Sequence, residues 1–281
     1  MNRSTPLVCT GWLAERLGEP DIRIADASWY LPQAGRNAKA EYASVHIPDA
    51  VFFDIDDLSD ETSPLPHMLA PAAKFAGRMR RLGFGGDDSI VVYDGAGLYS
   101  SPRAWWMLLA MGHRNVFVLD GGLPKWRREG HPVEFLRARP PRRDFTPHPN
   151  LTIVRDLPQM IMNLKTRAEQ VVDARGAARF AGAEPEPRAG VRSGHIPGST
   201  NIPYTLLTNA DGTLKSRADL RALFAEKRVD LSAPLVTSCG SGVTAALAML
   251  ALQVAGATTV ALYDGSWAEW GAHTDAPVES D

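Results

Sequence analysis

One stretch of the chain places a nucleophile in a setting that suits a negatively charged sulfur. Cys239 follows the apolar run 235–238 and precedes the Gly-Ser-Gly stretch 240–242. The two glycines let the backbone turn tightly, so that successive N–H groups can converge on one spot. A helix beginning at Gly242 or Val243 would add its positive end. These donors would stabilise a thiolate or a persulfide on Cys239, and the structural alternative is a small core cysteine beside a tight turn.

The segments around this stretch alternate between strands and helices. Short β-rich apolar runs predict strands at 22–25, 90–93, 116–119, 170–172, 235–237 and 259–262. Longer segments of helical period predict helices at 71–82, 102–111, 218–227 and 243–255. Such alternation is typical of mostly parallel α/β sheets with helices on both faces. Cys239 would then lie at the carboxyl end of a strand, where open sheets of this kind bind ligands.

The chain also repeats itself, with a period of about 147 residues that is the separation of Asp26 and Asp173. Motifs of the first half return in order in the second half: Asp26-Ala27-Ser28 as Asp173-Ala174-Arg175, His46-Ile47-Pro48 as His195-Ile196-Pro197, Ile90–Gly97 as Pro234–Gly242, and Asp120-Gly121 with Trp126 as Asp264-Gly265 with Trp270. The third match sets Asp94 opposite Cys239. We therefore expect a duplicated α/β domain whose first copy lacks the nucleophile.

The predicted domains are residues 1–136 and 153–281, with a linker at 137–152. The linker contains Pro140, Pro141, Pro147 and Pro149. Proline removes a backbone donor and restricts the residue before it, which favours an extended conformation. The arginines between 137 and 143 are expected to be solvated rather than to bind an anionic partner, because no aromatic residues are interleaved with them.

Composition excludes several classes of function. The chain has 281 residues, 44% hydrophobic, and a net charge of −2, which does not indicate a nucleic-acid partner. Residues 1–13 lack the apolar run of a secretory signal, and no 18-residue apolar stretch could span a bilayer. With no export signal, Cys9 and Cys239 are expected to be free thiols in a cytoplasmic protein. No Cys-x-x-Cys pair, His/Cys metal spacing or Gly-x-Gly-x-x-Gly turn is present, so no metal or nucleotide cofactor is indicated.

The tandem repeat, the His-Ile-Pro motifs and the sequence Cys239-Gly240-Ser241-Gly242-Val243-Thr244 together resemble the rhodanese superfamily, most closely the 3-mercaptopyruvate sulfurtransferases. The resemblance extends from about Val8 to Trp270. It implies that Cys239 carries sulfur as a persulfide and that Gly240, Gly242, Val243 and Thr244 line the substrate site. Relatives that prefer thiosulfate typically have Arg and Lys after the cysteine, where this chain has Gly240 and Ser241. Phosphatases of the same fold need an arginine six residues after the cysteine, where this chain has Ala245.

The resemblance also implies which residues bind the carboxylate of the donor, 3-mercaptopyruvate, and which protonate the pyruvate enolate that leaves when the sulfur is transferred. The motif of the family's second domain places the two arginines that bind this carboxylate at Arg179 and Arg188. Arg175 and Arg192 are nearby alternatives. A planar arginine suits a carboxylate because it can bind both oxygens. Protonation of the departing enolate is assigned to Ser241, His67 and Asp56, aligned like the relay of a serine protease. Asp54 and Asp57 are alternatives to Asp56, and both Asp56 and His67 could instead be structural.

The expected reaction transfers sulfur from 3-mercaptopyruvate through Cys239 to cyanide, a small thiol or a thioredoxin-like protein, and it releases pyruvate. The alternatives are a thiosulfate:cyanide sulfurtransferase and a non-catalytic rhodanese-like module that binds partners. The first copy, with Asp94 in the place of the cysteine, is expected to be catalytically inactive. His46 and His195 occur in both copies, which favours a structural role for them.

Overall fold

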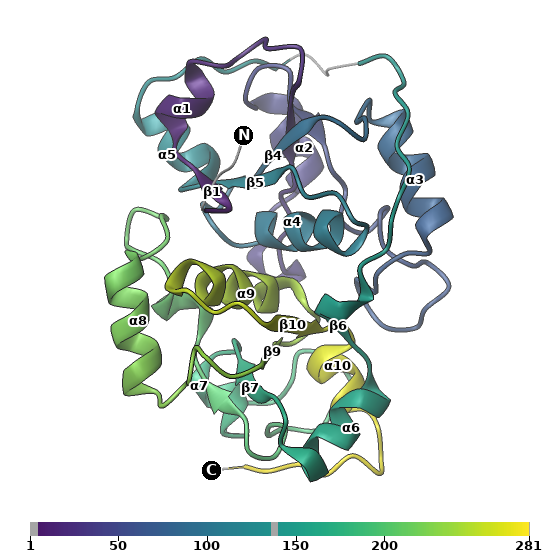
Figure 1. Ribbon diagram of the computed structural model, residues 1–281, viewed down its shortest axis with the longest axis vertical. Helices are drawn as coiled ribbons and strands as arrows, with labels where there is room; N and C mark the ends of the chain where they lie inside the picture. The colour runs from purple at the N-terminus through teal and green to yellow at the C-terminus, as the bar shows by residue number, and fades with distance from the viewer. Residues whose placement is uncertain (1–4, 136–139, 281) are drawn as a thin grey trace. The chain divides into compact units, whose positions relative to one another are not determined.

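The repeats fold into two α/β units, each with its own sheet and core (Figure 1). The computed structural model describes residues 5–135 and 140–280. Unit 1 comprises Met1–Glu61, Leu69–Asn150 and Asn209–Leu214, and unit 2 comprises Thr62–Met68, Leu151–Thr208 and Lys215–Asp281. Each repeat therefore contributes a short segment to the unit formed by the other. In unit 1, for example, the N–H of Leu214 donates to the Asp120 carboxylate over 2.8 Å.

Unit 1 is built on a five-stranded parallel sheet of order β1-β5-β4-β2-β3. Its strands are β1 (Leu7–Val8), β2 (Ile22–Asp26), β3 (Val51–Phe52), β4 (Ser89–Tyr93) and β5 (Val116–Leu119). Its helices are α1 (Thr10–Ala14), α2 (Ala38–Ser44), α3 (Ala72–Arg81), α4 (Ser101–Ala110) and α5 (Gly122–Arg128), with a 3₁₀ turn at Pro32–Ala34.

Unit 2 repeats this design with the sheet order β6-β10-β9-β7-β8, also parallel throughout. Its strands are β6 (Val154–Arg155), β7 (Gln170–Asp173), β8 (Thr200–Asn201), β9 (Leu235–Ser238) and β10 (Val260–Tyr263). Its helices are α6 (Leu157–Thr166), α7 (Ala177–Phe180), α8 (Arg217–Glu226), α9 (Val243–Ala255) and α10 (Ser266–Trp270), with 3₁₀ turns at Leu151–Ile153 and Tyr204–Leu206. The shared strand order confirms the duplication and the fold class.

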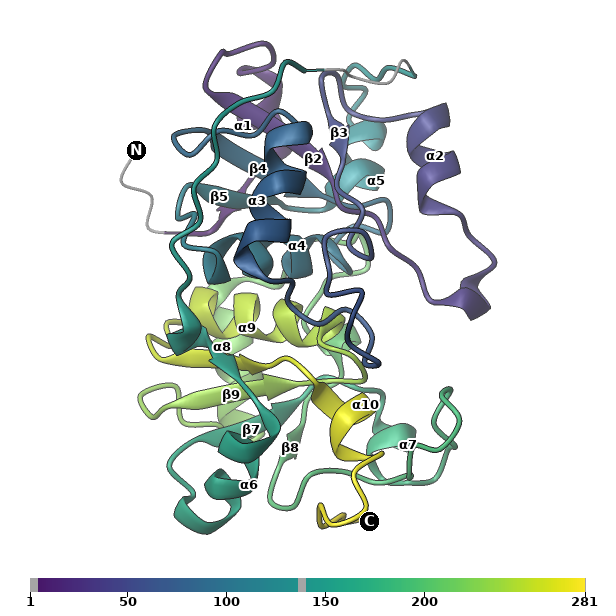
Figure 2. The ribbon, with the colours of Figure 1, turned by 90° about the vertical axis from the view of Figure 1, so that its right-hand side faces the viewer.

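Helices cover both faces of each sheet, as expected for parallel strands that are buried on both sides. In unit 2, α9 packs on β9 and β10, and Figure 2 shows α6 on the opposite side of the strands. The core beneath α6 and α10 contains Met160, Val236, Tyr263, Trp267 and Trp270. Nearly all of α9 is buried, because the helix is apolar around its whole circumference.

The predicted elements agree with the observed ones to within one or two residues at each end. The helix at 243–255 has the predicted limits, and Gly256 ends it with φ of 113°. The two-residue strands β1, β3, β6 and β8 were not predicted. Among the described residues, no helix combines the length and apolarity needed to cross a bilayer.

The proline-rich segment lies along unit 1. The predicted domain boundary at residue 136 and linker residues 137–139 fall outside the described part of the chain. From residue 140 to 150 the backbone forms no helix or strand, and the N–H of His148 donates to the carbonyl of Met111 over 2.8 Å. Arg143 is not simply solvated as expected, since it forms a 2.8 Å ion pair with the buried carboxylate of Asp88.

Candidate active site

Cys239 lies at the carboxyl end of β9, in the short loop that leads into α9. The thiol residue is buried, with 2% of its surface exposed, and it makes no disulfide. Gly242, immediately before α9, has φ of 79°, a conformation that favours glycine. Val243 and Thr244 form the first turn of the helix, whose first N–H groups have no partner within the helix. The predicted position of Cys239, between a strand and a helix N-terminus, agrees with this geometry.

The backbone of the loop is fixed by the start of α10. The carbonyl of Cys239 accepts from the N–H of Trp267, and the carbonyl of Gly240 accepts from the N–H of Ala268, each over 2.9 Å. In a trans peptide the carbonyl and the following N–H point in opposite directions. The N–H groups of Gly240 and Ser241 are therefore directed away from α10. Neither donates to an acceptor in the part of the chain that the structure describes, so both are available to an anion.

The equivalent loop of unit 1 binds the carboxylate of Asp94. Asp94 follows β4 as Cys239 follows β9, and its carboxylate is completely buried. It accepts four backbone hydrogen bonds of 2.8–3.0 Å and one hydroxyl bond of 2.8 Å, which come from Ala96, Tyr99, Ser100 and Ser101. The loop of unit 1 is thus an anion cradle filled by its own side chain.

Arg179, on α7, lies beside the Cys239 loop. A Cβ atom built on Gly240 would lie 3.1 Å from Nη2 of Arg179, so the guanidinium covers this glycine. The carboxylate of Glu186, whose side chain is only 3% exposed, pairs with Arg179 and fixes its orientation. Glu186 also forms a 2.8 Å ion pair with Arg175. The sequence analysis did not identify Glu186, although it lies between the two predicted arginines.

The structure distinguishes the four arginines of this segment. Arg175 is buried against the ring of Trp267, and its donors bind Asp173, Glu186 and the carbonyl of Gly194. Arg192 donates to main-chain carbonyls of Trp270, Gly271, His273 and Ala276. Both alternatives are therefore committed to the fold. Arg188, partly exposed, has neither a hydrogen bond nor an ion pair among the described residues, which leaves its donors available.

Of the three predicted relay residues, Ser241 and His67 belong to unit 2 and Asp56 belongs to unit 1. Ser241 is buried in the Cys239 loop, with 6% of its surface exposed. His67 lies in the segment Thr62–Met68 of unit 2, is 8% exposed, and has φ of 61°, which is uncommon for a residue with a side chain. Asp56 belongs to unit 1, is exposed, and accepts a 3.1 Å hydrogen bond from the indole of Trp29. Asp54, by contrast, accepts from the N–H of Asp57 within its own turn.

Both His-Ile-Pro histidines have structural partners, as expected. Nδ1 of His46 lies 2.7 Å from the carbonyl of Tyr42, and Nδ1 of His195 lies 2.9 Å from the carbonyl of Phe180. Each imidazole also stacks on the ring of that same residue. The matching contacts in the two copies indicate a shared role in folding.

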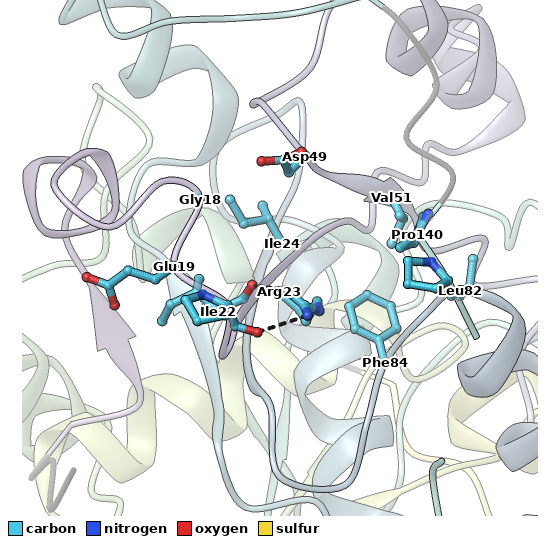
Figure 3. A pocket seen from close by; sticks show the side chains of 12 residues that line it. Gly18, Glu19, Ile22, Arg23, Ile24, Asp49, Val51, Leu82, Phe84 and Pro140 are labelled. Atoms are coloured by element: carbon cyan, nitrogen blue, oxygen red, sulfur yellow. Dashed lines mark hydrogen bonds between the residues drawn. The ribbon is translucent and has the colours of Figure 1, made fainter. Parts of the chain in front are cut away.

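A pocket of about 330 Å³ in unit 1 has no residue of the Asp94 loop among its lining residues (Figure 3). Ile22, Arg23 and Pro140 are among the residues that line it. The guanidinium of Arg23 donates to the carbonyls of Ile22 and Pro20 and lies 3.6 Å from Asp88. Because this cation is held by the protein itself, we assign no function to the pocket.

Comparison with known proteins identifies the family. The chain matches the rhodanese-like domain twice, at residues 10–129 and 155–273. It therefore belongs to the rhodanese family, as the sequence motifs predicted.

Three of its relatives are named for sulfur transfer. The chain is 47% identical to human 3-mercaptopyruvate sulfurtransferase over 271 residues, covering 94% of this chain and 91% of the human one. It is 45% identical to mouse thiosulfate sulfurtransferase over 272 residues, with the same coverage. Its structure resembles that of the 3-mercaptopyruvate sulfotransferase SseA from Escherichia coli, with a TM-score of 0.86, 43% identity, and coverage of 94% of this chain and 99% of the other. The chain is almost equally identical to a 3-mercaptopyruvate enzyme and to a thiosulfate enzyme. Sequence identity therefore does not distinguish the two sulfur donors, and the donor must be inferred from the site.

Proposed function

We propose that this protein is a 3-mercaptopyruvate sulfurtransferase. The observation that carries the proposal is the loop itself: Cys239 is followed by the N–H groups of Gly240 and Ser241, which have no acceptor among the described residues, and Arg179 covers Gly240. The sulfur passes from 3-mercaptopyruvate to Cys239 and then to a thiol or cyanide acceptor. We also propose a cytoplasmic location, where both cysteines would stay reduced.

The reaction has two steps and needs no cofactor. The Cys239 thiolate attacks the thiol sulfur of the substrate, the carbon–sulfur bond breaks, and its electron pair leaves on carbon as the enolate of pyruvate. A proton then converts the enolate to pyruvate, while Cys239 holds the transferred sulfur as a persulfide. In the second step an acceptor thiolate or cyanide attacks the outer sulfur, and the Cys239 thiolate is regenerated.

The loop N–H groups stabilise the charge on sulfur in both steps. Before transfer they stabilise the charge on the attacking sulfur, and after transfer the negative charge on the outer sulfur of the persulfide. The filled cradle at Asp94 supports this role, because an anion occupies the same position in the other copy. That carboxylate also makes unit 1 a catalytically inactive copy.

The charge of the arginine cluster favours a monoanionic donor. Arg175 and Arg179 are balanced by Asp173 and Glu186, and Arg192 is bound to main-chain carbonyls, which leaves Arg188 as the arginine of the four without a partner among the described residues. The single carboxylate of 3-mercaptopyruvate matches this charge, and Arg179 with Arg188 can bind its two oxygens. Thiosulfate is a compact dianion, and Gly240 and Ser241 offer it no cation inside the loop.

Protonation of the enolate is assigned to Ser241, acting through His67. Two features of His67 support the assignment. It belongs to the unit that contains Cys239 although it comes from the first repeat, and it has an unusual backbone conformation. Such conformations cluster at functional sites, where the surrounding structure maintains them.

The experiment that tests the proposal is donor-specific kinetics. Wild type, Arg179→Ala and Arg188→Ala are compared on 3-mercaptopyruvate and thiosulfate, with Arg175→Lys as a control for the fold. We expect wild type to prefer 3-mercaptopyruvate and each alanine variant to lose at least tenfold in kcat/KM for that donor, since each loses a charged hydrogen bond to its carboxylate. A wild type that prefers thiosulfate would contradict the donor assignment, and a protein inactive on both would support a partner-binding module.

A further inference from the structure

Ser266, which the proposed mechanism does not use, lies directly behind the nucleophile. It is the first residue of α10 and is completely buried. Its hydroxyl accepts a 3.3 Å hydrogen bond from the backbone N–H of Cys239 and donates a 2.9 Å bond to the carbonyl of Tyr263. Among the described residues, no other side chain hydrogen-bonds to the main chain of Cys239.

The backbone at Ser266 would suit glycine better than serine. Its φ is 49°, in the left-handed region where a side chain crowds the following carbonyl. The equivalent residue of unit 1 is Gly122, with φ of 52°, at the same place after Asp120-Gly121. The fold therefore accepts glycine at this turn, and unit 2 has serine in spite of the strain. Strain of this kind in a buried residue next to a nucleophile points to a functional role.

The two copies differ in how their loops are ordered. In unit 1 the Asp94 carboxylate binds the loop N–H groups itself, and Gly122 provides no side chain. In unit 2 the residue equivalent to Asp94 is Cys239, whose sulfur is a weak hydrogen-bond acceptor and cannot order the loop in the same way. In both copies the helix that follows the next strand fixes the carbonyl of the loop residue: α5 through the N–H of Leu123 in unit 1, and α10 through the N–H of Trp267 in unit 2. The hydroxyl of Ser266 is an additional attachment found only in the copy with the nucleophile.

We propose that Ser266 is a positioning residue for Cys239. By holding the N–H of Cys239 toward the end of β10, it fixes the direction of the Cα–Cβ bond, so that the sulfur stays within reach of the N–H groups that follow. Removing the hydroxyl lets the loop rotate, and a smaller fraction of molecules then holds the sulfur in the reactive geometry. The loss falls on the chemical step and leaves the arginines that bind the donor unchanged. This inference rests on the proposed role of Cys239 as the nucleophile.

The test compares Ser266→Gly and Ser266→Ala with Ser216→Ala. The glycine variant removes the hydroxyl and the strain together, whereas the alanine variant removes only the hydroxyl. Ser216 caps α8 through a 3.1 Å bond from the N–H of Asp219, so its alanine variant loses a serine hydrogen bond of unit 2 away from Cys239. The measurements are thermal unfolding, kcat and KM for 3-mercaptopyruvate, and the rate of Cys239 alkylation by iodoacetamide at a fixed pH, followed by peptide mass spectrometry.

We expect both Ser266 variants to lose about tenfold in kcat and in alkylation rate, with KM changed less than twofold. The glycine variant should unfold at no lower temperature than the alanine variant, while Ser216→Ala should unfold earlier and keep the wild-type kcat. A Ser266→Gly protein with wild-type kcat and alkylation rate would overturn the inference. Alkylation does not depend on the sulfur donor, so it tests the positioning role separately from the proposed function. If the wild type is inactive on 3-mercaptopyruvate but both Ser266 variants are alkylated more slowly than wild type, the positioning role is supported and the proposed function is contradicted.

Discussion

Replacing Glu186 with glutamine should change both the stability of unit 2 and its choice of donor. The Glu186 carboxylate is almost fully buried and pairs with two arginines, at 2.8 Å from Arg175 and in close contact with Arg179. Glutamine has nearly the same shape and keeps one oxygen acceptor, but it removes the negative charge. The charge of the cluster around Arg179 then rises by one.

The size of both effects follows from this geometry. Removing one partner of a buried ion pair typically costs about 3–5 kcal/mol, and we expect about 3 kcal/mol here because glutamine retains an acceptor. If the bound donor is taken to lie about 6 Å from Glu186, one unit charge contributes about 3 kcal/mol at an effective dielectric constant of about 20. The side chain of Arg179 is 23% exposed, so solvent screens part of this interaction. We therefore expect the substitution to favour binding of a dianionic donor over a monoanionic one by about 1.4 kcal/mol of free energy. This corresponds to a tenfold change in the preference between the two donors.

The assay is steady-state kinetics on both donors, together with urea unfolding. For Glu186→Gln, the ratio of kcat/KM for thiosulfate to that for 3-mercaptopyruvate should rise about tenfold. The matched control is Glu184→Gln, two residues away, where an exposed carboxylate forms no ion pair with any described residue. This control should keep the wild-type ratio and stability. If Glu186→Gln leaves the donor ratio unchanged, the cluster charge does not select the donor and our reasoning is wrong.

Two further predictions concern the carboxylates of unit 1. Burial raises the pKa of Asp26 from 3.8 to about 6. The folded protein therefore binds the proton of this carboxyl more tightly than the unfolded chain does. As a result, it loses up to about 3 kcal/mol of stability as pH rises from about 4 to about 7. Asp26→Asn, which keeps an acceptor for the N–H of Ser28, should therefore be more stable than wild type in urea at pH 7.5 but not at pH 4, and a pH-independent difference would argue against this explanation. Asp94→Ala should lower the stability of unit 1 by about 3 kcal/mol, because four N–H groups lose their acceptor, and millimolar sulfate should restore part of it. Unchanged thermal unfolding of Asp94→Ala would contradict the cradle.

The sequence predicts the fold well where local pattern and tertiary structure agree. The apolar run 243–255 ends at Gly256 and forms a helix with the predicted limits. The two-residue strands β1, β3, β6 and β8 were missed because so short a ladder depends on its neighbours in the sheet rather than on its own residues. The assignment of Thr62–Met68 to unit 2 also could not be predicted, since the repeat pattern places it in the first copy.

The site was predicted in part for similar reasons. Cys239 could be predicted as the candidate nucleophile because glycines and a following helix are visible in the sequence. Choosing among the arginines required their partners, and those of Arg192 lie about 80 residues away in the sequence. Glu186 and Ser266 were missed because each acts on another residue. The repeat contained a signal for Ser266, since its counterpart Gly122 is a glycine.

The most direct test of the account is mass spectrometry of the protein after incubation with 3-mercaptopyruvate in the absence of an acceptor. We predict one added sulfur on the peptide that contains Cys239, its removal by cyanide, and no adduct in Cys239→Ser. The exposed thiol of Cys9 provides an internal comparison in the same sample. A wild-type protein that gains no sulfur, or that gains it on Cys9 instead, would contradict the assignment of Cys239 as the carrier.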